Sequence, residues 1–295
     1  MVMIIRRVIQ KINPRMISSL STVAPGLGDK KVFTSLQNFG KIDANNLSLK
    51  NKIITDRGLK KYMSDIYVKS GGGFGASLGI GITAPVILSS LPISGSLLVG
   101  VWLGNIGLSF YSIYKMSKLN TRTIEKEDGL YEENNQDKER WYKIFCVSNG
   151  LMIAPLIGIT LATNPVVIPL ATVATLSTFG GATYAALKQT DTNLVSYQGP
   201  LIGCVWGLIG TGVFQMFAAM MGYSSLANTM DIMTSLASVG VFTTLVAVDT
   251  QVAIEDYGNK KLDSINVSTQ LLLDATNLFI DFIKLLNRLT GNNDD

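Results

Sequence analysis

Long apolar runs dominate the chain, and the charged residues lie between them. No Lys or Arg occurs within residues 70–114, 144–187 or 189–259. A soluble domain would need charged side chains over such lengths, whereas an isolated charge in hydrocarbon costs several kcal/mol. Apolar stretches of roughly 10 to 14 residues fit a buried helix of a soluble protein, but a bilayer-spanning helix needs about 20. The runs exceed that length, so the pattern predicts an all-α membrane protein.

The apolar runs divide into seven hydrophobic segments at turn-forming residues. Asn164-Pro165 predicts a tight turn, and Gly199-Pro200 opens a further segment, because proline at a helix start loses no hydrogen bond. The segments cover about residues 71–93, 95–114, 144–162, 165–187, 199–222, 232–249 and 265–287. We therefore expect a transmembrane helical domain over residues 71–289, after a soluble-side segment over residues 29–70.

Small residues recur at four-residue spacing inside several of these segments. In lipid the hydrophobic effect does not drive helices together, so close approach over small residues must supply the attraction through dispersion. The spacing predicts close helix packing at Gly71, Gly75 and Gly79, at Gly100 and Gly104, and at Gly203 and Gly207.

The first 28 residues are basic, rich in hydroxyl groups and free of acids. Ile5, Val8 and Ile12 form one apolar helical face beside basic side chains. This is the pattern of a mitochondrial transit peptide, and we expect residues 1–28 to have that role. A basic interfacial anchor helix and a disordered tail are the alternatives.

Basic residues fall on one side of the predicted membrane domain. The loops near residues 93, 163 and 226 carry no Lys or Arg. The positive-inside rule then places the basic side and the N-terminus in the matrix, with the protein in the inner membrane, if the transit peptide is correct. Topology also accounts for the net charge of +4, so no nucleic-acid partner is expected. The basic residues occupy the 29–69 segment, the 115–143 loop with seven Lys and Arg, Lys188 and the 250–264 loop.

Histidine is absent from the chain. Its absence argues against His-dependent zinc or haem sites and against a Ser-His-Asp triad. The sequence also shows no other nucleophile–base pair or metal-ligand cluster, so we expect neither an enzyme nor a resident cofactor. Proton chemistry near neutral pH must then come from carboxylates in unusual surroundings.

Three acids occur in the last two hydrophobic segments. Asp249 follows an apolar run, and it is either a functional acid or an interfacial residue at a helix end. Asp274 lies among apolar residues with no basic neighbour one helical turn away. Asp281 precedes Lys284 by three positions, which predicts an ion pair. A carboxylate in the membrane is costly unless it lines a cavity, pairs or is protonated, so Asp249 and Asp274 are candidate functional residues.

The stretches around these acids resemble the Bax inhibitor-1, or transmembrane Bax inhibitor motif, family. They are Asp249-Thr-Gln251 and, 25 residues after the first aspartate, a Leu-Leu-Asp-x-x-Asn-Leu-Phe run around Asp274. Ala154-Pro-Leu156 and Leu262-Asp-Ser-Ile-Asn266 are similar to its mitochondrial branch, the growth-hormone-inducible transmembrane proteins. The likeness covers residues 59–289.

The resemblance implies a fold of seven helices in which six surround a central C-terminal helix. It also implies a calcium-permeable, pH-sensitive pathway that two aspartates control, here Asp249 and Asp274. Lys115 stands where the family has a basic residue at the end of the second span. Lys115, Gln251 and Asp281 are therefore candidate supporting residues.

The chemistry of two buried carboxylates agrees with this expectation. Such a pair cannot ionise freely in a low dielectric, so it shares a proton and titrates as a unit. After losing that proton, Asp249 and Asp274 would offer oxygen ligands to Ca²⁺. We therefore expect transport of Ca²⁺ across the lipid bilayer, by a pH-sensitive leak channel or a Ca²⁺/H⁺ exchanger. The alternative is a non-conducting scaffold that binds other inner-membrane proteins and influences cristae organisation and apoptosis.

The transit-peptide interpretation is tested by location. Removing residues 1–28, or changing Arg6, Arg7 and Arg15 to Glu, is expected to leave the protein outside mitochondria, because import requires a basic amphipathic helix. Fractionation of cells that express the tagged variants measures this. A truncated chain that still reaches mitochondria would overturn the interpretation.

Overall fold

The computed structural model describes residues 48–90, 95–127, 129–133 and 135–290, without the side chains of residues 95–99 and 224. The predicted transit peptide, residues 1–28, lies outside the described residues. So do residues 29–47 of the segment predicted over residues 29–70, whose described part begins at Ser48.

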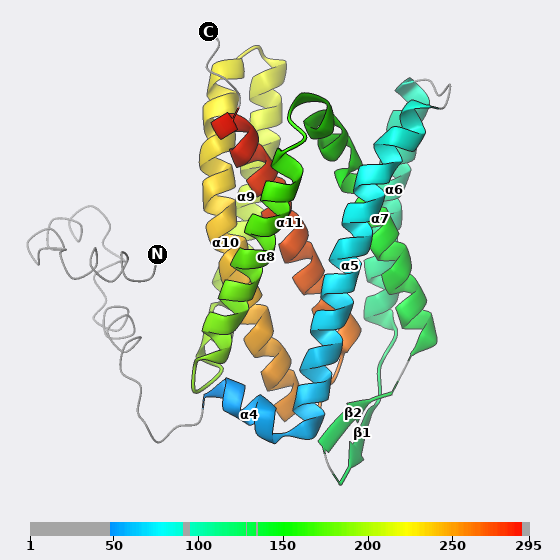
Figure 1. Ribbon diagram of the computed structural model, residues 1–295, viewed down its shortest axis with the longest axis vertical. Helices are drawn as coiled ribbons and strands as arrows, with labels where there is room; N and C mark the ends of the chain where they lie inside the picture. The colour runs from blue at the N-terminus through cyan, green and yellow to red at the C-terminus, as the bar shows by residue number, and fades with distance from the viewer. Residues whose placement is uncertain (1–47, 91–94, 128, 134, 291–295) are drawn as a thin grey trace, which may run out of the picture. The chain divides into compact units, whose positions relative to one another are not determined.

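Helices make up nearly all of the described chain (Figure 1). Five of them are long and apolar enough to cross a membrane, which confirms the class of an all-α membrane protein. The smaller elements are α4 (Leu49–Thr55), the strands β1 (Thr123–Lys126) and β2 (Gly129–Glu132), and the 3-10 helix η1 (Asn193–Tyr197). The long helices are α5 (Arg57–Ser89), α6 (Gly95–Lys118), α7 (Gln136–Thr163), α8 (Val167–Leu187), α9 (Gln198–Met220), α10 (Ser224–Gly258) and α11 (Ser264–Thr290).

Each predicted hydrophobic segment falls on one of these helices, but several helices continue into polar sequence. Helix α5 begins at Arg57, where the Asp56 side chain accepts a hydrogen bond from the Leu59 amide at 3.0 Å. Helix α7 begins at Gln136, where Asn135 caps the Lys138 amide in the same way. Such caps satisfy free amides of the first turn and fix where a helix starts. The charged stretch over residues 125–140 is therefore not a plain loop, because it contains the end of β1, the strand β2 and the start of α7.

Helix α11 lies at the centre of the bundle, as the resemblance implies (Figure 1). It packs against α10, α5 and α8, and to a smaller extent against α7. Leu271, Leu272, Leu278 and Phe279 of α11 have no exposed surface. Helix α9 instead packs mainly against α10, and most of its apolar side chains are exposed, as suits a helix in contact with lipid.

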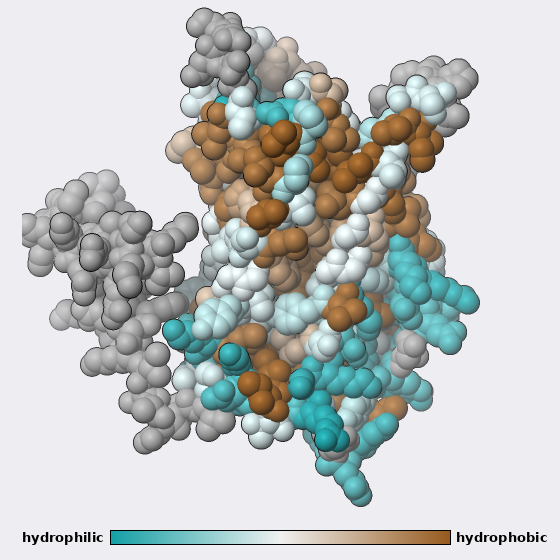
Figure 2. All heavy atoms as spheres, in the orientation of Figure 1, coloured by the Kyte–Doolittle hydropathy of each residue, from teal (hydrophilic) through white to brown (hydrophobic). Residues whose placement is uncertain are grey.

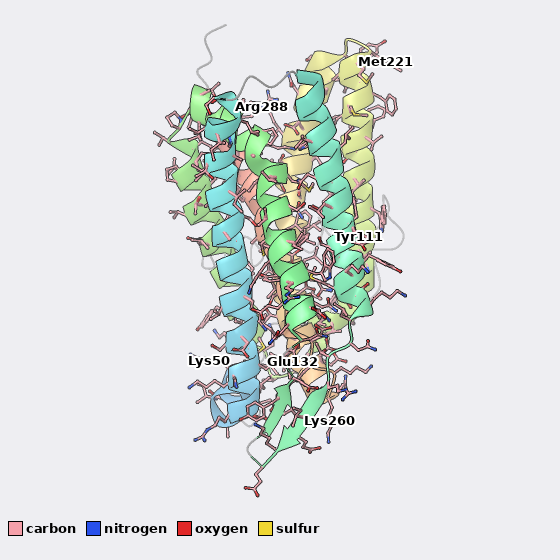
Figure 3. The ribbon with its side chains drawn as sticks, turned by 90° about the vertical axis from the view of Figure 1, so that its right-hand side faces the viewer. Lys50, Tyr111, Glu132, Met221, Lys260 and Arg288 are labelled. Carbon is pink, nitrogen blue, oxygen red and sulfur yellow. The ribbon has the colours of Figure 1, made fainter. Side chains whose placement is uncertain are left out.

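The two ends of the bundle differ in polarity. Hydrophilic residues gather around α4 and the β1–β2 hairpin, whereas apolar residues cover much of the remaining visible surface (Figure 2). Lys50, Glu132 and Lys260 lie at this hydrophilic end, and Met221 and Arg288 lie at the other (Figure 3). The basic loops therefore share one end of the bundle. That this end faces the matrix stays a prediction.

The glycines at four-residue spacing do not lie at contacts between helices of the described chain. Within the described part of the chain, the prediction of close packing at the spaced glycines is wrong. A methyl group added there would meet no described atom within 4 Å, which holds for Gly71, Gly75, Gly79, Gly100, Gly104, Gly203 and Gly207. Helices α5 and α7 instead approach each other over other glycines. A Cβ at Gly73 would lie 2.4 Å from the Tyr142 hydroxyl, and one at Gly150 would lie 2.6 Å from the Ser77 carbonyl oxygen.

This difference predicts opposite effects for two neighbouring substitutions on α5. Gly73→Ala is expected to destabilise the fold by about 1–3 kcal/mol, because the new methyl group displaces a Tyr142 hydroxyl that donates to the Lys69 carbonyl at 2.7 Å. Gly75→Ala, which faces open space, is the matched control and is expected to leave stability unchanged or to raise it by up to about 1 kcal/mol. Thermal unfolding of the purified variants in detergent, followed by circular dichroism, measures both. Equal melting temperatures for the two variants would contradict the assigned packing.

Candidate functional site

The structure brings Asp249 of α10 and Asp274 of α11 together. Asp249 lies nine residues before the end of α10 at Gly258, and Asp274 lies ten residues after the start of α11 at Ser264. The two helices run in opposite directions from the connecting turn, so nearly equal counts place both residues at about the same height. Their carboxyl groups lie within hydrogen-bonding range of each other.

Both carboxylates are deeply buried. Asp249 and Asp274 are each 5% exposed, so Asp249 is an interior residue well inside α10 and not an interfacial residue at a helix end. The Oδ2 atom of Asp274 is buried and has no hydrogen-bond partner among the described residues. Buried polar atoms are normally satisfied, and an exception calls for an explanation such as a function or a missing ion or water. No donor among the described residues reaches this oxygen, which leaves the Asp249 carboxyl group as the polar neighbour of Asp274.

The Asp249-Thr-Gln251 motif connects α10 to three different elements. Asp249 faces α11, as described above. The Thr250 hydroxyl lies 3.0 Å from the hydroxyl of Tyr67 on α5. The Gln251 side chain accepts from the Leu194 amide of η1 at 2.8 Å and donates to the Ala186 carbonyl of α8 at 3.3 Å. Three consecutive residues thereby fix the position of α10 against its neighbours.

Two of the expected supporting residues do not reach the aspartate pair. Gln251 is fully buried against the α8–η1 connection, where it satisfies backbone groups. Lys115 lies near the end of α6 with its ammonium group 5.4 Å from the centre of the Tyr111 ring. This is a cation–π contact at a partly exposed site.

Asp281 has a different partner from the one predicted. Ser238 of α10 donates a hydrogen bond to its carboxylate. Lys284 reaches across to α10 instead, where it binds Asp231 at 3.2 Å. The predicted ion pair between Asp281 and Lys284 is therefore wrong, because a carboxylate on the adjacent helix competes for the same ammonium group.

Sequence reasoning missed the polar junction that holds the α10–α11 turn. Lys138 at the start of α7 is 1% exposed and binds Asp263 of the turn at 2.5 Å. Its ammonium group also donates to the Leu119 carbonyl at 3.0 Å. In the sequence Lys138 stands among many other charged residues of the 115–143 loop, so nothing marks it as the one that becomes buried.

The β1–β2 hairpin completes this junction. Glu132 of β2 accepts a hydrogen bond from the Ser264 amide at 2.8 Å, which caps the first turn of α11. Thr121 donates to the Leu262 carbonyl at 2.8 Å, and Glu125 of β1 pairs with Lys260 at 2.8 Å. The hairpin thus fixes the turn from which both aspartate-bearing helices extend.

The oxygen ligands at the aspartate pair are few. The described residues contain no group of three or more His, Cys, Asp or Glu side chains that could hold a metal ion. Asp249 and Asp274 can supply only part of the six to eight oxygen ligands that Ca²⁺ takes. A Ca²⁺ ion at this position would therefore need further oxygen ligands, such as backbone carbonyl groups or water.

These features define a class: a multi-pass helical membrane protein with a buried pair of carboxylates between its central helix and a neighbouring helix. The sequence model of the family described as inhibitor of apoptosis-promoting Bax1 matches residues 59–293, and the chain belongs to this Bax inhibitor-1 family. No curated protein matches the chain at a significant level.

The contacts of Gln251 predict a structural role for this residue. Gln251→Leu is expected to lower stability by about 1–3 kcal/mol, because it leaves the Leu194 amide and the Ala186 carbonyl without their partner. Thermal unfolding in detergent measures the loss, and Gln270→Leu on an exposed position of α11 is the control. An unchanged melting temperature for Gln251→Leu would remove the assigned role.

Proposed function

We propose that the chain is a pH-sensitive pathway for Ca²⁺ across the membrane, a leak channel or a Ca²⁺/H⁺ exchanger, with Asp249 and Asp274 as its proton-sharing control site. The observation that carries this proposal is the contact between the two buried carboxyl groups, together with the unpartnered Oδ2 atom of Asp274. A protein with a purely structural core has no need of two adjacent acids in the interior of its membrane domain.

The pair can respond to both ions through one set of oxygens. With one shared proton the two carboxyl groups form a hydrogen bond and hold α10 and α11 together. Without that proton the two negative charges repel each other in a low dielectric and attract a cation. Proton loss therefore loosens the contact between the helices and prepares it for Ca²⁺ in the same step.

The scaffold alternative has less support. Its main argument is the charged 115–143 loop, which could bind a partner protein. Much of that loop is engaged within the chain, because Glu132 caps α11 and Lys138 is buried against Asp263. A scaffold also offers no use for the aspartate pair.

The proposed location is the mitochondrial inner membrane, with the basic end of the bundle and the N-terminus in the matrix. The basic, acid-free residues 1–28 and the absence of Lys and Arg from the loops near residues 163 and 226 support it. Membership of the Bax inhibitor-1 family makes regulation of apoptosis the setting in which this flux acts.

Reconstitution into liposomes tests the mechanism. Asp249→Asn and Asp274→Asn keep size and hydrogen bonding but remove the titrating group, so each is expected to flatten the pH dependence of Ca²⁺ flux between acidic and neutral buffer. The double substitution is expected to add much less than the sum of the two single effects, because residues in contact act non-additively. A Ca²⁺-sensitive dye inside the liposomes reports the flux.

Asp137→Asn is the control, because this acid is exposed and, among the described residues, forms a salt bridge with Arg140 of the same helix alone. It is expected to leave both the flux and its pH profile unchanged. If Asp249→Asn and Asp274→Asn also retain full flux and an unshifted profile, the two aspartates have a structural role and the transport mechanism fails.

A further inference from the structure

Helix α11 carries a second buried carboxylate besides Asp274, and it lies on the same side of the helix. Asp281 is 7% exposed and follows Asp274 by seven residues, which places it two helical turns, or about 10 Å, further along the helix. The fully buried Leu278 lies between the two acids. This direction leads toward the end of the bundle where Arg288 lies (Figure 3).

No basic side chain in the described part of the chain forms a salt bridge with Asp281. The nearby Lys284 pairs with Asp231 at 3.2 Å, and Arg288 lies 4.0 Å from the second oxygen of the same Asp231. The buried Asp281 carboxylate accepts a hydrogen bond from the Ser238 hydroxyl, and the charge of Lys284 acts on it from beyond salt-bridge distance. A buried carboxylate without a directly bound counter-ion is costly, so the site favours binding of a cation.

A second hydroxyl at the site is left without a partner. Ser235 is 1% exposed, and its Oγ atom has no hydrogen-bond partner among the described residues. It lies one helical turn from Ser238 on α10, and its side chain faces the Asp281 carboxylate. Two hydroxyl oxygens and a carboxylate therefore converge between α10 and α11, and of the two hydroxyls only that of Ser238 is close enough to the carboxylate for a full hydrogen bond.

We propose that Asp281, Ser235 and Ser238 form a second binding site for a hard divalent cation. Oxygen atoms are the ligands that Ca²⁺ and Mn²⁺ prefer. A single carboxylate, with the Lys284–Asp231 ion pair beside it, gives a weak site, as a position of transient binding on a transport path requires. The identity of Ca²⁺ as the natural ion rests on the proposed function, whereas cation binding at this site does not.

Direct binding of Mn²⁺ tests the site independently of transport. Free Mn²⁺ is measured by electron paramagnetic resonance in a titration of the purified full-length protein in detergent. The Asp249→Asn/Asp274→Asn double variant is expected to retain Mn²⁺ binding, and adding Asp281→Asn to it is expected to weaken that binding by about tenfold or more, which corresponds to about 1.4 kcal/mol. The protein with all three substitutions thus isolates the contribution of Asp281.

Ser235→Ala separates a ligand from a structural residue. Because the Ser235 hydroxyl bonds to no described residue, its removal is expected to leave the melting temperature unchanged while weakening Mn²⁺ binding in the double variant several-fold. Thr183→Ala is the matched control, because the Thr183 hydroxyl is also buried without a partner but belongs to α8. It is expected to leave Mn²⁺ binding unchanged.

The outcomes separate the two proposals. Mn²⁺ binding that is unaffected by Asp281→Asn and by Ser235→Ala, or absent from the double variant altogether, overturns the second site. Unaltered Ca²⁺ flux in Asp249→Asn and Asp274→Asn overturns the proposed control mechanism alone. In liposomes, Asp281→Asn is expected to lower Ca²⁺ flux without moving its pH profile.

Discussion

The contact between Asp249 and Asp274 is the constraint that the arrangement of the last two helices has to satisfy. Each carboxylate is almost fully buried, and neither has a basic side chain bonded to it in the described residues. Two adjacent acids in an apolar interior are costly if both are ionised, unless a proton or a cation lies between them. Every other contact of α10 and α11 has to be compatible with that requirement, because a misplacement of either helix would leave a charge alone in an apolar interior.

Contacts at the polar end of the bundle set the positions of the two helices that carry Asp249 and Asp274. The hairpin and the start of α7 hold the α10–α11 turn, through Glu132 on the Ser264 amide and Lys138 on Asp263. From this fixed turn, two regular helices reach Asp249 and Asp274 at equal height. On the other side, Gln251 ties α10 to the α8–η1 connection. The site is thus positioned by contacts made well away from it.

Much of this arrangement could be predicted from the sequence. The apolar runs predicted the helices, and the spacing of Asp249 and Asp274 from their common turn agrees with the contact that the structure shows. The hairpin and the partner of Lys284 could not be predicted, since both depend on which charged residue of another segment comes near. Glycine spacing likewise does not reveal which face of α5 meets α7; bulky Tyr142 and the Ser77 backbone select Gly73 and Gly150 instead.

The regular glycines of α5 give its outer face a distinct character. At Gly71, Gly75 and Gly79 the helix presents bare backbone, with no atom of the described residues near the position of a Cβ. In a bilayer, the methylene groups of acyl chains would supply the dispersion contacts that side chains do not make there. The bilayer would then contribute to the stability of this helix, and a detergent that packs less closely against the glycines would contribute less.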